Sequence, residues 1–100
     1  RENTSKANKI FKLREEVMND LFEKTKSSNV PAVVNALFEK PIFSASNITH
    51  AKDVNQKTGH RLINSLKELG YIIELIPASG RRAAIYCFPK LVTITESSAL

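Results

Sequence analysis

A run of polar and basic side chains between positions 56 and 67 is the part of this sequence best suited to chemistry. Its members recur at intervals of three and four residues, so in a helix they would share one exposed face. Lys and Arg donate to phosphate oxygens, and Gln, Arg and Asn can form paired hydrogen bonds with base edges. The residues are Gln56, Lys57, Thr58, His60, Arg61, Asn64 and Lys67. Their chemistry is that of a nucleic-acid contact.

A second basic group follows at Arg81 and Arg82, beside Ser79 and Gly80. Residues 41–90 hold seven Lys/Arg against three Asp/Glu, whereas residues 1–40 hold eight against six. Most of the net charge of +5 therefore falls in the half of the chain that carries both groups. This distribution favours a polyanionic partner, although a helix face with Lys and Arg is also a common solvated surface.

The sequence gives little support for metal binding, disulfide formation or catalysis. His50 and His60 belong to different predicted helices and have no acidic residue or cysteine at ligand spacing, so we expect no metal. The single cysteine, Cys87, excludes an internal disulfide and is expected to be a core residue. No catalytic Ser/His/Asp order or phosphate-binding Gly loop occurs. We expect this chain alone to be no enzyme and to need no cofactor.

The composition fits one folded domain. With 100 residues, 42% hydrophobic and 25% charged, the chain is long enough for one core and too short for two. Apolar runs are too short to cross a membrane, and no signal peptide is visible, so the expected location is cytoplasmic. Because the chain begins at Arg1 and not at methionine, we expect it to belong to a longer protein.

Apolar residues at helical spacing predict a long first helix from about Thr4 to Lys26. Its stripe consists of Ile10, Phe11, Leu13, Val17, Met18, Leu21 and Phe22. A second helix is predicted from about Val30 to Glu39, with Asn29 or Ser28 as N-cap and Pro41 as its stop.

Residues 42–45 fit an extended connection or a small strand, and a short third helix should follow from about Asn47 to Asp53 with Ser46 as N-cap. Asn55 should cap a fourth helix that ends at Leu69 before Gly70. The small residue Gly59 is expected where this helix crosses the third one.

The last third of the chain changes to strand periodicity. Residues 71–76 and 83–88 are rich in β-branched and aromatic residues, and Pro77 to Arg82 between them predict a hairpin turn. For Tyr71 and Tyr86, core packing is favoured over a contact across the hairpin. Residues 90–94 should form a last turn of helix or strand, and the chain should fray from Thr95.

This order of elements predicts an α+β, mostly helical fold: a winged helix-turn-helix domain with a three-helix core and a two-stranded hairpin wing, preceded by a long amphipathic helix. The expected divisions are a connector helix over 1–28, the winged domain over 29–95 and a tail over 96–100.

Three motifs extend this prediction to a family. The segment Leu37-Phe38-Glu39-Lys40-Pro41 is similar to a Leu-Phe-Glu-x-Pro helix end, residues 66–73 approximate a Leu-x-x-Leu-x-x-x-Gly-Ile-Leu pattern, and Arg82 with Tyr86 fits Arg-x-x-x-Tyr. Over about residues 10–95 the chain resembles the C-terminal winged helix of Fic (filamentation-induced-by-cAMP) proteins. It departs from the family at Gly59, where Ala is common, and at Tyr71, which interrupts the usual Gly-Ile-Leu spacing. It also lacks the signature His-Pro-Phe-x-x-Gly-Asn-Gly-Arg. The resemblance implies a bacterial parent that transfers AMP to protein hydroxyls, with its catalytic domain upstream of Arg1.

Three functional hypotheses follow. In the first, the chain is a transcription-regulatory accessory domain that binds double-stranded DNA, with Gln56, Lys57, Arg61 and Asn64 in the groove and Lys67, Arg81 and Arg82 on phosphates. In the second, it is an interaction module that docks the upstream catalytic domain or a second copy. The docking stripe would then be Ile10, Phe11, Val17, Met18 and Phe22. In the third, it is a transcription regulator unrelated to Fic proteins.

Overall fold

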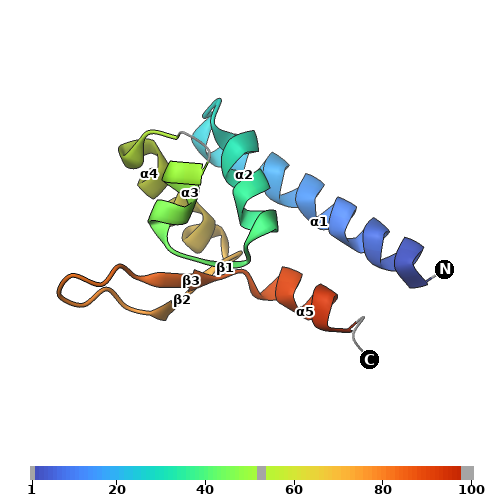
Figure 1. Cartoon of the computed structure of the whole chain (residues 1–100). Helices are drawn as coiled ribbons and strands as arrows, with labels where there is room; N and C mark the ends of the chain where they lie inside the picture. The colour runs from blue at the N-terminus through green and yellow to red at the C-terminus, as the bar shows by residue number, and fades with distance from the viewer. Residues whose placement is uncertain (1, 52–53, 98–100) are drawn as a thin grey trace.

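The computed structural model describes the backbone of residues 2–51 and 54–97 and the side chains of residues 5–49 and 54–95. Within these residues the chain forms five helices and one small antiparallel sheet (Figure 1). The fold is therefore α+β and mostly helical, as predicted. The elements are α1 (Glu2–Thr25), α2 (Val30–Glu39), β1 (Ile42–Phe43), α3 (Ala45–Ala51), α4 (Gln56–Leu69), β2 (Ile73–Ile76), β3 (Ile85–Cys87) and α5 (Pro89–Ser97).

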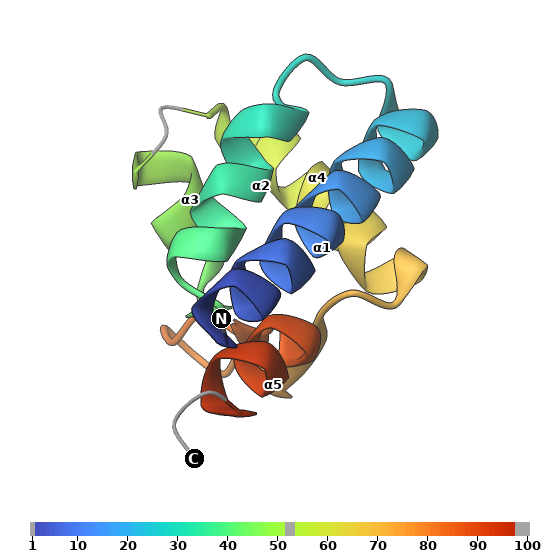
Figure 2. The same cartoon turned by 90° about the vertical axis from the view of Figure 1, so that its right-hand side faces the viewer.

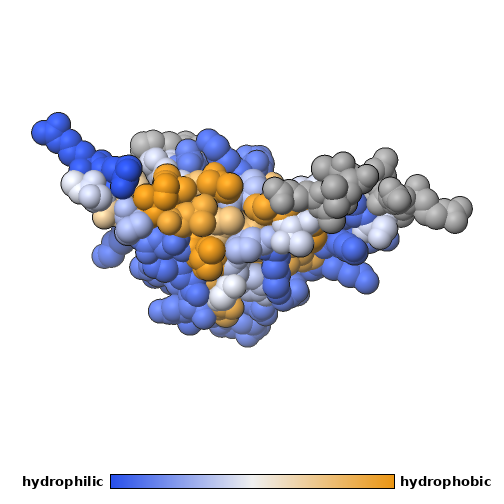
Figure 3. Space-filling view, turned by 90° about the horizontal axis from the view of Figure 1, so that it is seen from below, coloured by the Kyte–Doolittle hydropathy of each residue, from blue (hydrophilic) through white to orange (hydrophobic). Residues whose placement is uncertain are grey.

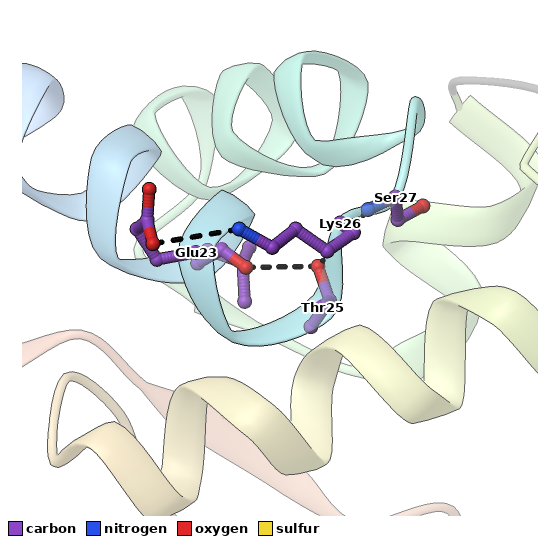
Figure 4. Close-up of polar contacts among 5 residues, drawn as sticks. Glu23, Thr25, Lys26 and Ser27 are labelled. Carbon is purple, nitrogen blue, oxygen red and sulfur yellow. Dashed lines mark hydrogen bonds and ion pairs between the residues drawn. The ribbon is translucent and has the colours of Figure 1, made fainter.

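The long helix α1 packs along the rest of the fold through one side. Leu13, Val17 and Leu21 are buried there against α2 and α4. The helix ends where Lys26 takes a left-handed conformation with φ of 55°, and the Lys26 amide donates to the Phe22 carbonyl at 2.7 Å. Thr25 and the Lys26–Glu23 ion pair surround this turn (Figure 4). The chain reverses here and enters α2.

Helix α2 has the predicted bounds, but it is capped differently. Asn29 occupies the N-cap position, yet its side chain makes no capping hydrogen bond. Its backbone N–H instead donates to Ser27 Oγ at 3.1 Å. Pro31 in the first turn has no backbone N–H that would need an acceptor, and its ring fixes a helical φ, so a side-chain cap is less necessary.

The short helix α3 begins earlier than predicted. Ala45 is its first residue, so the prediction of Ser46 as N-cap was wrong. The reason is that Asn47 Oδ1 accepts from the Ser44 amide at 2.8 Å, which fixes the turn one step upstream. The helix ends at Ala51, and residues 52–53 of the predicted third helix lie outside the described residues.

Helix α4 matches its prediction at both ends. The Asn55 side chain accepts from the amides of Lys57 and Thr58, and Gly70 closes the helix with φ of 88°. Gly59 lies where α4 meets α3: a Cβ at this position would stand 2.5 Å from Thr49 Cγ2. The close approach of the two helices therefore requires the glycine, as predicted.

The sheet has three strands in the order β1-β3-β2, whereas the sequence predicts a two-stranded hairpin. Ile42 and Phe43 pair with Cys87 and Tyr86, which makes residues 42–43 a strand and not only a connection. The hairpin strands are also shorter than predicted. Tyr71 and Ile72 precede β2 and are buried in the core, and Tyr71 contacts both α1 and the end of α4.

The chain after β3 forms a helix. Residues 89–97 make up α5, so Thr95 to Ser97 are helical and not part of a frayed tail; residues 98–100 lie outside the described part. In Figure 2, α5 lies beside the N-terminal half of α1. Phe88 and Leu91 anchor this corner in the same hydrophobic core that α1, α2 and α4 share.

Candidate nucleic-acid interface

Helix α4 has two faces of opposite character. Leu62, Ile63 and Leu66 are at most 1% exposed and pack into the core. The other face carries the polar residues singled out by their spacing. Gln56, Lys57, His60, Arg61 and Asn64 are all exposed. The structure thus brings five of the predicted residues together on one solvent-facing surface.

Thr58 and Lys67 differ from these five. Thr58 is half-buried beside the N-cap, where its amide donates to Asn55. Lys67 Nζ lies 3.5 Å from Glu74 Oε1 on β2 and 5.8 Å from the centre of the Tyr86 ring on β3. Lys67 therefore links α4 to the hairpin, a role that sequence reasoning missed.

The hairpin tip presents the two remaining predicted residues. Ser79 and Arg82 exchange backbone hydrogen bonds of 3.0 and 2.9 Å, and Gly80 supplies the positive φ of 56° that this tight turn needs. Arg81 and Arg82 are exposed. The tip and the start of α4 both lie on the left of Figure 1, away from α5. We call Gln56, Lys57, His60, Arg61, Asn64, Lys67, Arg81 and Arg82 the cationic face.

Hydrophobic surface borders this face at the sheet. Seen from below, apolar atoms gather over the sheet next to the hydrophilic hairpin tip (Figure 3). The exposed apolar residues of β1 and β2 are Ile42 at 50%, Ile73 at 50%, Leu75 at 48% and Ile76 at 41% exposure. Alternation could not have indicated this second face, because all four positions of β2 are exposed and its run is almost continuously apolar.

Tyr71 joins α1 to the end of α4. Its hydroxyl donates to Glu16 Oε2 at 2.8 Å and to Asp20 Oδ2 at 2.5 Å, and its ring packs edge-on against Phe88. Burial, with these two hydrogen bonds and the nearby carboxylate charges, raises the pKa of Tyr71 well above its usual range. Tyr86 packs instead on Phe43, so the two tyrosines do not meet across the hairpin.

The proposed docking stripe of α1 is not one surface. Val17 is fully buried, and Ile10 and Met18 are partly buried against the core. Phe11 and Phe22 remain exposed, at 62% and 46%. The prediction that these five residues form one docking surface was wrong. The apolar stripe is wider than the side of α1 that packs on the core, so some of its residues are buried in the core and others lie on the surface.

Groups that could support other chemistry are scattered. Cys87 is a buried free cysteine in β3, as predicted. Within the described part of the chain, no three His, Cys, Asp or Glu side chains gather as they would around a metal ion. The side chain of His50 lies outside the described residues. Among the described helices, none combines the length and apolar composition needed to cross a membrane.

No protein-family model matches this chain, and no curated protein has a matching sequence.

Proposed function

We propose that this chain is a winged helix-turn-helix domain that binds double-stranded DNA through α4 and the hairpin tip. Helix α3 and helix α4 are the helix-turn-helix pair, and the β2–β3 hairpin is the wing. The order of helices, the tight approach of α3 to α4 at Gly59 and the hairpin after α4 support this assignment.

The observation that carries the proposal is the exposed face of α4. Its polar side chains project from a helix whose opposite face is fixed in the core, so the helix can present them rigidly to a major groove roughly 12 Å wide. Arg61 and Asn64 have the planar donor groups that read base edges. Arg81 and Arg82 would then contact phosphates on the flanking backbone.

Fluorescence anisotropy with labelled random-sequence duplex DNA tests the proposal. With Lys67, Arg81 and Arg82 on phosphates, the logarithmic salt slope should be about −2.7, so affinity should fall about 40-fold between about 50 and about 200 mM salt. The Arg81→Ala/Arg82→Ala variant should bind more weakly and lose about two units of slope. The matched control Lys9→Ala/Lys12→Ala removes two charges on α1 and should bind as the parent does. Absence of binding at low salt would overturn the proposal.

The resemblance to Fic proteins leads to a second part of this proposal. The chain would serve as an accessory domain that brings an upstream AMP-transferring enzyme to DNA in the bacterial cytoplasm. The same DNA contacts would serve a transcription regulator outside that family, so the anisotropy experiment does not depend on the parent.

A second candidate function is self-association through α1. The exposed Phe11 and Phe22 lie eleven residues apart, which places them on the same flank of the helix, about 16 Å from each other. Such an aromatic flank fits a second copy of α1 or an upstream domain. Sedimentation of the chain should show a concentration-dependent dimer that Phe11→Ser/Phe22→Ser abolishes; a monomer at all concentrations excludes self-association.

A further inference from the structure

A groove between α1 and α5 combines an aliphatic floor with a basic rim. Its volume is about 450 Å³. The helix α5 and the N-terminal half of α1, which line it, lie at the end of the molecule opposite the hairpin tip (Figure 1). The groove is therefore separate from the cationic face. The lining residues are Lys9, Lys12, Leu13, Glu16, Pro89, Lys90, Thr93 and Ile94.

The floor of the groove is apolar and would contact apolar side chains of a ligand. Leu13 is 6% exposed, and Pro89 and Ile94 are half-buried. The aliphatic stems of the neighbouring lysines extend this surface. Phosphate binding has no need of such a floor, so the groove suits a ligand with apolar groups of its own.

The rim of the groove is basic and would attract negatively charged groups of a ligand. Lys9 and Lys12 are exposed along α1, and Lys90 faces them from α5. Among the described residues of the lining, the one carboxylate is Glu16, which accepts a hydrogen bond from Tyr71 and lies 3.9 Å from Lys90 Nζ. Because Glu16 is already paired in this way, the rim keeps a net positive charge from Lys9 and Lys12.

The shape of the groove favours a polypeptide. The α1 side runs from Lys9 to Glu16, about two helical turns or roughly 10 Å. The groove is open to solvent, whereas a small-molecule site encloses roughly 70 to 90% of its ligand. A helix lying along α1 and α5 would cover the floor and place its flanking side chains beside the lysines.

We propose that this groove binds an acidic amphipathic helix of a partner protein. Apolar residues of the partner at positions i, i+3 or i+4, and i+7 lie on Leu13, Pro89 and Ile94. Carboxylates beside them pair with Lys9 and Lys12. The chain would then bind this partner with one end, independently of whatever the cationic face binds.

A fluorescein-labelled helical peptide built from Leu at those positions, Glu on both flanks and Ala elsewhere tests the inference by anisotropy with the full chain. We expect micromolar binding, and a Kd at least about tenfold higher for Lys9→Glu/Lys12→Glu. The matched control Lys57→Glu/Arg61→Glu makes the same change of charge on the cationic face and should keep the parent Kd. Thr93→Glu, an exposed site on the α5 side, should weaken binding as well. Circular dichroism confirms that each variant is folded.

Further ligands test which chemical features the groove recognises. A peptide with Ser in place of Leu, or Lys in place of Glu, should fail to bind, and duplex DNA should not displace the acidic peptide. The inference is overturned if the acidic peptide does not bind, if both charge-reversal variants weaken it equally, or if DNA competes for the site. Binding of dodecanoate without binding of the peptide would instead identify a lipid pocket and would also overturn it.

Discussion

The two faces of α4 differ in nearly every physical property. The inner face is apolar, fixed by Leu62, Leu66 and the close crossing at Gly59. The outer face is polar and solvated, with Arg61 and Asn64 among its side chains. One helix thus carries the determinants of folding on one side and those of the proposed binding on the other. Substitutions should therefore separate stability from DNA affinity, which makes the comparison testable.

The largest effect should come from the inner face. Leu66→Ala removes a fully buried side chain from the core, and we expect a loss of about 2 to 5 kcal/mol in the free energy of unfolding. Urea denaturation measures it. Asn64→Ala, two residues away on the outer face, is the matched control and should change the unfolding free energy by less than about 0.5 kcal/mol. Equal losses of unfolding free energy in the two variants would mean that both faces of α4 contribute equally to stability.

A smaller effect is expected on the outer face, and it should appear in binding alone. Arg61→Ala removes a paired donor suited to guanine, so affinity for the preferred duplex should fall by about 1 to 3 kcal/mol and sequence preference should relax. Selection from random duplexes followed by anisotropy measures both. An unchanged DNA sequence preference would contradict the role of Arg61 in base reading. A lowered melting temperature of the variant protein would mean that Arg61 stabilises the fold.

The crossing of α3 and α4 gives a sharper test of the inner face. Gly59→Ala places a methyl group against Thr49 Cγ2, and because Thr49 is buried and stiff we expect destabilisation of about 1 to 2 kcal/mol. Thr49→Ser removes that methyl group. The double variant should regain most of the loss in a thermal denaturation cycle; purely additive losses would show that the clash is not the cause.

The smallest effect concerns Tyr71 and depends on pH. Because its pKa is raised in the folded state, the unfolded chain loses this proton first, so the raised pKa lowers stability only as pH rises above about 10. The slope from one such group is at most about 1.4 kcal/mol per pH unit. Tyr71→Phe should flatten the decline measured by urea denaturation in alkaline buffers. A slope identical to that of the parent chain would contradict the cause given for the pKa.

Local signals made most of the fold predictable. Capping and terminating residues such as Asn55, Gly70 and Pro41 fixed the ends of helices within a few residues, because these effects act over one turn. The start of α3 differs because of the local hydrogen bond from the Ser44 amide to Asn47, and other features depend on tertiary contacts. A small strand was one of the two alternatives predicted for residues 42–45, and its pairing with β3 decides between them; the stripe of α1 divides because its packing side is narrower than its apolar side.

The candidate site was also predictable in part from local sequence signals. Helical periodicity identified the exposed side of α4, including Arg61 and Asn64, since spacing alone sets which residues share a face. The contact of Lys67 with Glu74 and Tyr86 could not be predicted, because it depends on how the hairpin folds back on the helix. The α1–α5 groove was hidden for the same reason: its two sides are more than seventy residues apart in the sequence.

The central claim is that the cationic face binds duplex DNA, and amide chemical-shift mapping tests it most directly. The isotope-labelled chain would be titrated with a short DNA duplex at low salt. We predict shifts concentrated in residues 56–67 and 79–82, with the amides of α1 unchanged. Shifts confined to α1 and α5, or the absence of any shift, would contradict the claim.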